Sequence, residues 1–268
     1  MTEYRYVKNL GTTPQEIRKK VLFLGYSEEI TRLISVLQMR GCSVWHAYDK
    51  INDFKGFDLI ITFGYRHIIP ASVLKSTMSP IINLHIGYLP FNRGAHPNFW
   101  SFFDGTPSGV TIHQVDEGID TGDIIFQKYV NFDRGEQTFK DTYTRLVEEV
   151  EQMFEDGLDT ILNGRFVPIV QRGDGTFHSS GELPSEFSNW DANICDEIKR
   201  LEKLGAVQSA NKIKIIDEIE AVRANNNVNW MDLLRLAFTA APKDAKEIVK
   251  RINHDDGRIS DLLKKLGE

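Results

Sequence analysis

The feature that most constrains the fold of this 268-residue chain is a series of short apolar runs separated by segments of helical spacing. A strand buried on both faces forms a nearly continuous apolar run, and such strands are typical of parallel sheets covered by helices. The runs at 21–26, 43–48, 58–64 and 81–86 fit this description, and the apolar spacing of 28–40 is helical. The sequence therefore predicts an α/β fold with a mainly parallel sheet.

Two further strands are expected at 109–116 and 123–132, because the turn-rich segment EGIDTG lies between two apolar runs. A long helix is expected at about 138–162. The composition then shifts, near Gly181, toward charged helical patterns. We therefore expect one domain at 1–180 and a small helical C-terminal region at 181–268.

The C-terminal region is expected to form three or four short amphipathic helices. Pro242 is well placed to begin one of them, because the first helical turn leaves its N–H groups unpaired and proline has none. The segment NWMDLLRLAF places several apolar residues along one helix, and this face must be covered. It can pack on the first domain, or against a second copy across a two-fold axis, and we expect a homodimer. The residues are Trp230, Leu233, Leu234, Leu236, Ala237 and Phe238.

Composition excludes several classes of protein. With 41% hydrophobic residues the chain can bury a full core, and a formal net charge of −6 offers no general attraction to nucleic acid or to an anionic membrane. The sequence shows no signal peptide and no apolar stretch of membrane-spanning length, so we expect a cytoplasmic protein. Two cysteines, Cys42 and Cys195, indicate neither a disulfide framework nor a cysteine zinc site.

Two polar residues interrupt the apolar run at 81–86. Asn83 and His85 are two residues apart, so on a strand their side chains face the same side. They lie near the carboxyl end of the strand, where open α/β sheets bind their ligands. Alone, such a pair is more typical of a hydrogen-bonded core or turn pair than of a site.

The segments that follow carry more chemistry. The loop LPFNRGAHP at 89–97 is rich in glycine and proline, and DEGIDTGDI at 116–124 forms an acidic turn. For Asp116, Glu117 and Asp123 the simplest interpretation is that these carboxylates cap backbone N–H groups of the turn.

In order and spacing, these three elements resemble the folate-dependent formyltransferases, which act on glycinamide ribonucleotide, methionyl-tRNA or sugar amines. The resemblance covers about 21–170 and none of the C-terminal region. It implies a Rossmann-like catalytic domain, N10-formyltetrahydrofolate as co-substrate, and a catalytic constellation of Asn83, His85 and Asp120.

The chemistry of these residue types agrees with formyl transfer. Attack of an amine on a formyl carbon creates an oxyanion, to which Asn83 can donate, and releases a proton, which His85 can accept. Asp120 can fix the tautomer of His85 and stabilise its charged form. No metal is required. A zinc site of His85, His113 and Asp120 is the competing interpretation, but their spacing matches no common zinc motif.

The resemblance also suggests where the ligands bind. The pterin would lie between the segment after the third strand and the acidic turn. For Ile68 and Ile69, plain core packing is nearly as good an explanation. The residues expected at the cofactor are Phe63, Tyr65, Ile68, Ile69, Gln114, Asp116 and Gly118. Arg93, Gly94 and His96 are expected at the acceptor substrate, where Arg93 could meet a phosphate or simply be a solvated loop residue. For His67 and His96 the simpler interpretation is a histidine in solvent or at the rim of the site.

The sequence limits which class of amine can be the formyl acceptor. The segment LGYSEEITR at 24–32 lacks the glycine-rich phosphate loop of a glycinamide ribonucleotide enzyme. From Leu183 to Glu268 there are 14 basic and 15 acidic residues, so the C-terminal region supplies no positive surface for tRNA. A nucleotide-linked amino sugar of surface-glycan synthesis, such as lipopolysaccharide O-antigen, is therefore the preferred acceptor. Two alternatives remain: a methionyl-tRNA formyltransferase-like enzyme, and a formyltetrahydrofolate hydrolase or folate-binding relative. Such hydrolases usually carry an N-terminal regulatory domain, for which about 20 residues before Val21 are few.

Overall fold

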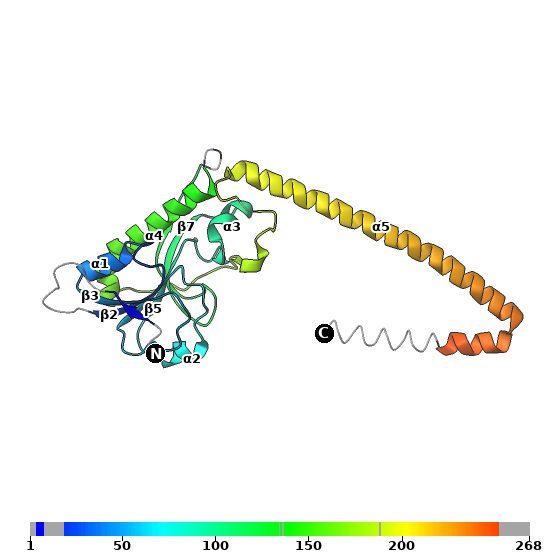
Figure 1. Cartoon of the computed structure of the whole chain (residues 1–268), viewed down its shortest axis with the longest axis horizontal. Coiled ribbons are helices and arrows are strands. Elements are labelled where there is room, and N and C mark those ends of the chain that lie inside the picture. The colour runs from blue at the N-terminus through cyan, green and yellow to red at the C-terminus, as the bar shows by residue number, and fades with distance from the viewer. Residues whose placement is uncertain (1–3, 8–18, 134, 136, 188, 252–268) are drawn as a thin grey trace. The chain divides into compact units, whose positions relative to one another are not determined.

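The computed structural model describes residues 4–7, 19–133, 135, 137–187 and 189–251 (Figure 1). The chain divides into two compact units, Met1–Leu201 and Glu202–Glu268. The first unit contains the sheet and every candidate site residue. The second is helical where it is described.

A seven-stranded sheet in the order β1-β3-β2-β4-β5-β7-β8 forms the centre of the first unit. The four adjacent strands β3, β2, β4 and β5 run parallel to one another, whereas β1, β7 and β8 are antiparallel to their neighbours. This confirms the expected α/β fold. The strands are β1 Arg5–Tyr6, β2 Lys19–Gly25, β3 Cys42–Ala47, β4 Leu59–Phe63, β5 Ile81–His85, β7 Gly109–Gln114 and β8 Ile124–Tyr129.

Two short strands form a separate parallel pair beside the sheet. They are β6 (Arg93–Gly94) and β9 (Phe177–His178). β6 lies in the loop after β5, and β9 comes from the segment that follows α4 (Phe139–Leu162). The pair therefore connects two segments that are far apart in the sequence.

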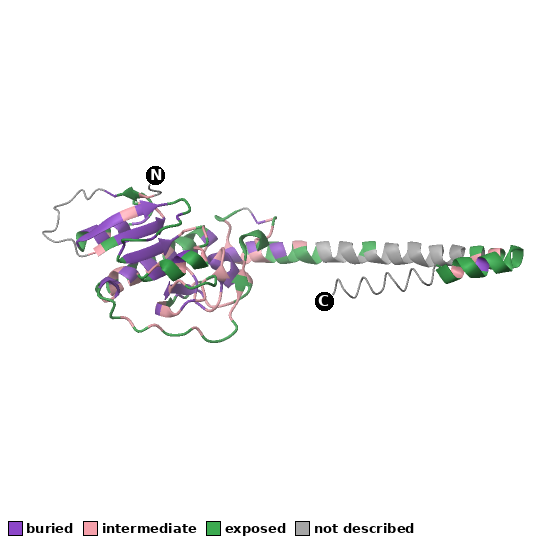
Figure 2. Ribbon diagram, turned by 90° about the horizontal axis from the view of Figure 1, so that it is seen from below, coloured by how far each residue is buried: buried purple, intermediate pink, exposed green. Residues whose placement is uncertain are grey.

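Helices pack on the sheet because the strands are apolar on both faces. The central strands are accordingly buried (Figure 2). α1 (Leu33–Met39) and α4 contact each other and enclose the largest apolar cluster against the sheet. α2 (Ala71–Ser76) contributes Val73 to a second apolar cluster, which contains Leu22, Leu24 and Ile60. α4 begins at a capping box between Thr138 and Asp141. α1 begins five residues later than the sequence indicates, because Ser27 accepts two backbone hydrogen bonds in a preceding turn.

A third apolar cluster explains where the first unit ends. Phe187 lies on α3 (Pro97–Phe103) and α4, with ring centroids 4.7 Å from Phe99 and 5.3 Å from Phe139. Ile194 and Leu201 belong to the same cluster. The first unit therefore extends to Leu201, and the boundary expected near Gly181 is too early because the apolar residues that follow it pack into this core.

The C-terminal segment differs from the expected series of short helices. α5 runs without interruption over Ile194–Ala240, since that stretch has no proline and a single glycine, Gly205. A further helical segment then begins at Pro242 and is described to 251, which confirms the role expected for this proline. Among the described residues, no helix has both the length and the apolar character needed to cross a bilayer.

Phe187→Ala should lower the free energy of unfolding of the first unit by about 3–5 kcal/mol, because it leaves a cavity among the aromatic rings of the third cluster. Urea denaturation of the full chain measures this. As a control, Val167→Ala removes methyl groups from a side chain that is 84% exposed and should change stability by less than about 0.5 kcal/mol. Equal stability of wild type and Phe187→Ala would contradict the boundary after Leu201.

Candidate active site

The site begins with three polar side chains that face one another across the sheet. Asn83 on β5 is the register partner of Thr62 on β4 and of His113 on β7. The Thr62 hydroxyl donates to Asn83 Oδ1 at 2.7 Å, and Asn83 Nδ2 lies 3.1 Å from His113 Nε2. His113 Nδ1 lies 2.7 Å from the Gln114 carbonyl and must carry the proton, so Nε2 accepts from Asn83. The side chains that the register places beside Asn83 therefore fix which way its amide points.

Asp120 joins this group from the turn between β7 and β8. Its Oδ1 accepts from Asn83 Nδ2 at 3.1 Å, and its Oδ2 accepts from the backbone N–H of Gly94 at 2.9 Å. Its φ is 53°, a left-handed conformation that is rare outside glycine. Burial opposes ionisation of this carboxyl, but His85, His113 and the Gly94 N–H outweigh it and hold the pKa of Asp120 well below its usual range. Asp120 is therefore an anion at neutral pH.

His85 lies between a carbonyl and this carboxylate. Its Nε2 lies 2.9 Å from the Asn92 carbonyl, which accepts only, so Nε2 carries the proton of the neutral ring. Its Nδ1 lies 3.6 Å from Asp120 Oδ2. The carbonyl of Asn92, rather than Asp120, therefore sets the tautomer, which corrects the expectation from the sequence. Asp120 is placed to stabilise the charged ring.

The charge state of His85 follows from its surroundings. Burial lowers the pKa of His85 below the ordinary histidine value, and Asp120 offsets this only in part. The imidazole is then neutral at pH 7 and has a free lone pair on Nδ1. After it accepts a proton, each ring N–H has an oxygen acceptor beside it, which is what a general base requires.

The acidic turn is held by its own side chains. Asp116 accepts from the N–H of Gly118 at 3.0 Å and from the Thr121 hydroxyl at 2.6 Å, as expected for a turn-capping carboxylate. Glu117 instead forms a surface ion pair with Lys75. A Cβ on Gly122 would lie 1.9 Å from the Gln114 carbonyl oxygen, so this position has no room for a side chain.

A segment that the sequence presents only as a connection after α4 supports the whole loop at 89–97. The N–H of Asn92 donates to the Thr176 hydroxyl, and β9 pairs with β6. Gln171 bonds to Arg93 and to two carbonyls of the acidic turn. Nothing in the local pattern of 171–178 marks these residues, because they bind backbone groups of distant segments.

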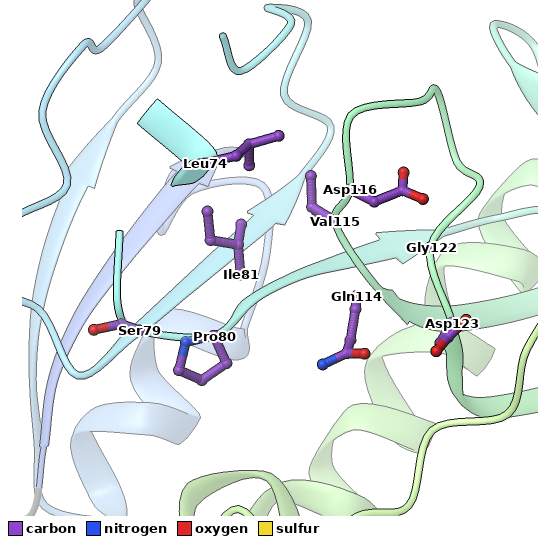
Figure 3. A pocket seen from close by; sticks show the side chains of 9 residues that line it. All are labelled: Leu74, Ser79, Pro80, Ile81, Gln114, Val115, Asp116, Gly122 and Asp123. Carbon is purple, nitrogen blue, oxygen red and sulfur yellow. The ribbon is translucent and has the colours of Figure 1, made fainter. Parts of the chain in front are cut away.

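The expected cofactor residues are only partly gathered at one place. Gln114 and Asp116 line a cavity of about 380 Å³ beside the acidic turn (Figure 3). Its other lining residues are Leu74, Ser79, Pro80, Ile81, Val115, Gly122 and Asp123. Gly118 lies in the same turn but does not line this cavity.

The remaining expected cofactor residues follow β4. Phe63 is buried in the sheet, and the Tyr65 hydroxyl binds the backbone at Asp49 and Ile51. Ile69 packs on the second apolar cluster, whereas Ile68 is 72% exposed and is therefore no core residue. Their part in cofactor binding stays a prediction.

The expected substrate residues lie in the loop around β6. Arg93 donates through Nε and Nη2 to Gln171 Oε1, so two of its guanidinium N–H groups are bound within the protein. Gly94 has φ 88°, and a Cβ there would lie 2.2 Å from the His178 carbonyl oxygen. Burial and the neighbouring Arg66 lower the pKa of His96, which precedes Pro97 at the start of α3. Whether they touch a substrate stays a prediction.

The three residues of the zinc alternative, His85, His113 and Asp120, do lie together. Three of the four imidazole nitrogens, however, already have a hydrogen-bond partner in the protein, and only His85 Nδ1 is available. Within the described ranges no set of three or more ligating side chains has the arrangement of a metal site.

Comparison with known proteins relates this arrangement to one family. Residues 43–157 match the family described as formyl transferase. Methionyl-tRNA formyltransferase of Lachnospira eligens is 29% identical over 160 residues, covering 59% of this chain and 50% of the relative. The dTDP-4-amino-4,6-dideoxyglucose formyltransferase of Mycobacterium tuberculosis is 30% identical over 122 residues, covering 46% and 51%. The chain thus spans about half the length of the curated relatives it matches.

A solved structure matches over a larger share of its own length. The formyltransferase PseJ from Anoxybacillus kamchatkensis, in complex with UDP-4,6-dideoxy-4-formamido-L-AltNAc and tetrahydrofolate, is 35% identical with a TM-score of 0.61. The match covers 65% of this chain and 95% of PseJ. By its sequence, its fold and the match to PseJ over nearly all of that protein, the chain belongs to the formyltransferase family.

Proposed function

We propose that this protein transfers the formyl group of N10-formyltetrahydrofolate to the amino group of a nucleotide-linked amino sugar. The observation that carries the proposal is the placement of His85, whose Nδ1 faces the ionised Asp120 while its Nε2 is held by the Asn92 carbonyl. A buried neutral imidazole with acceptors ready for both of its N–H groups is suited to receive the proton of an attacking amine.

The reaction follows from these positions. The amine nitrogen attacks the formyl carbon, and the π electrons of the carbonyl move to its oxygen. His85 takes the proton that the nitrogen loses, and Asp120 stabilises the resulting imidazolium. The oxyanion then re-forms the C=O bond as the bond from the formyl carbon to N10 breaks, and N10 receives the proton that His85 holds. The products are a formamide and tetrahydrofolate, and His85 is neutral again.

Asn83 is proposed as the donor to the oxyanion. Its Nδ2 donates to Asp120 and to His113 in this structure, so one of its N–H groups must turn to the reacting oxygen. The bond from Thr62 keeps Oδ1 away from that oxygen and leaves the amide nitrogen toward the site.

For the acceptor, a sugar amine is favoured over methionyl-tRNA by two observations. PseJ is described in complex with a UDP-linked formamido sugar, and the C-terminal segment 183–268 carries 14 basic against 15 acidic residues. The first acceptor to test is the amine from which that formamido sugar would be made. We accordingly place the protein in surface-glycan synthesis, such as that of lipopolysaccharide O-antigen, and in the cytoplasm.

The full chain, supplied with 10-formyltetrahydrofolate and UDP-4-amino-4,6-dideoxy-L-AltNAc, should give a product heavier by one formyl group in mass spectrometry. His85→Ala and Asp120→Ala should each lower turnover at least about tenfold, because they act on proton transfer, and Asn83→Ala about a hundredfold. Parallel reactions contain dTDP-4-amino-4,6-dideoxyglucose, methionyl-tRNA, or no acceptor. Formylation of the tRNA alone would indicate a methionyl-tRNA formyltransferase instead. Release of formate without any acceptor would indicate a formyltetrahydrofolate hydrolase.

Gly87→Ala should lower turnover at least about tenfold while the fold survives, because a Cβ at this position would lie 2.5 Å from His85 Nε2 and must displace the ring. Gly181→Ala is the matched control, since its Cβ would meet nothing within 4 Å. Kinetics of both variants with the formyl acceptor provide the comparison. Wild-type turnover in Gly87→Ala would show that the position of His85 is not critical.

We also propose that the protein is a homodimer, through the apolar residues of α5. Leu233, Leu236 and Phe238 are exposed, and the side chain of Trp230 lies outside those the structure describes. Light scattering at micromolar concentration should report a dimer for the wild type and a monomer for the double variant Leu233→Asp, Leu236→Asp. Thr239→Asp adds one negative charge to α5 outside these leucines as a control. A monomeric wild type contradicts the proposal.

A further inference from the structure

Gln171 uses its whole amide to connect two segments of the candidate active site. Its Nε2 donates to the carbonyl oxygen of Asp120 at 2.9 Å and to that of Gly122 at 2.7 Å. Its Oε1 accepts from Arg93 Nε at 3.2 Å and Nη2 at 2.8 Å. A glutamine has two N–H donors and one oxygen with two lone pairs, so no hydrogen-bonding capacity is left over.

The two carbonyls that Gln171 binds belong to the part of the turn that is most constrained. Asp120 has a φ of 53°, which is unfavourable for a residue with a side chain, and Gly122 packs against the Gln114 carbonyl. Fixing the peptide planes after Asp120 and after Gly122 fixes the backbone from which the Asp120 carboxylate projects.

Through Arg93, Gln171 also holds β6, the strand on the opposite side of Asp120 from the acidic turn. The residue after it, Gly94, donates its N–H to Asp120 Oδ2 at 2.9 Å. One glutamine amide therefore holds both the turn that carries the carboxylate and the strand that supplies a donor to it. A small shift between these two segments would change the distance from Asp120 to His85, now 3.6 Å.

From this geometry we propose that Gln171 is a positioning residue for formyl transfer, which sets the position of the Asp120 carboxylate relative to His85 by holding the acidic turn against β6. This proposal rests on the function proposed above. It assigns Gln171 no contact with either substrate. An effect that passes through Asp120 lowers kcat, whereas one that passes through Arg93, which is expected at the acceptor, changes the KM for that substrate.

Glutamate at position 171 is the sharpest variant. It keeps the length of the side chain and its acceptor for Arg93, but it places a carboxylate against two carbonyl oxygens in place of an N–H donor. Gln171→Glu should lower kcat at least about tenfold and change the KM for 10-formyltetrahydrofolate and for UDP-4-amino-4,6-dideoxy-L-AltNAc less than about threefold. Gln171→Met, which has no donor and only a weak acceptor, should lower kcat similarly. Gln152→Glu, on the surface of α4, is the charge-matched control and should keep wild-type kinetics.

The dependence on Asp120 is tested by introducing Gln171→Glu into an Asp120→Asn background. There it should change the residual kcat by less than about twofold, because the group it positions has already lost its charge. Losses that multiply, or a loss confined to KM, would overturn the proposal. The proposal would also be overturned if thermal unfolding showed that the Gln171 variants contain less folded protein while their kcat per folded molecule equalled that of the wild type. A wild type inactive with every acceptor overturns the proposed function and this inference together, whereas an active wild type with an equally active Gln171→Glu overturns only this inference.

Discussion

The candidate site depends on keeping one carboxylate ionised in a buried position. Asp120 is largely covered by protein, where an unpaired charge would be very costly. Its oxygens are compensated by the Asn83 amide from β5 and the Gly94 N–H from β6, with His85 and His113 beside them. These donors come from elements that are distant in the sequence. The loop at 89–97 therefore has to close onto the acidic turn, and any change that opens this closure leaves a buried charge without a partner.

The sheet supplies the part of the site that needs no loop. β5 is the strand at which the pairing changes from parallel to antiparallel, and polar side chains at one register position form a line across three strands. Thr62 donates to Asn83, Asn83 donates to His113, and His113 donates to the Gln114 carbonyl. Because each partner of this chain of hydrogen bonds sits on a strand fixed by its ladder, the amide of Asn83 has one orientation before any substrate arrives.

The sequence predicts what depends on periodicity and local chemistry. The apolar runs place β2, β3, β4 and β5 closely, and the two-residue spacing puts Asn83 and His85 on one face, as the structure confirms. What depends on distant backbone groups is not visible in the sequence. Gln171, Thr176 and Asn92 act through main-chain N–H and carbonyl groups, for which many residue types could serve. The end of the first unit was likewise hidden, since Phe187, Ile194 and Leu201 follow a polar, turn-like segment and resemble the helical region after them.

The backbone of the site is strained in a way that explains why so many supporting bonds gather there. Among the described residues, the non-glycine residues with positive φ are Asn92, His96 and Asp120, and all three border the site. Such conformations persist where the surroundings determine them from several sides. Asn92 is held by Thr106 and Thr176, and Asp120 by Gln171. In return, the strained residues point the Asn92 carbonyl at His85 Nε2 and the Asp120 carboxylate toward His85 Nδ1. The supports outside the sheet are thus what hold His85 between its two acceptors, and the energy they contribute offsets the strain of the geometry that they impose.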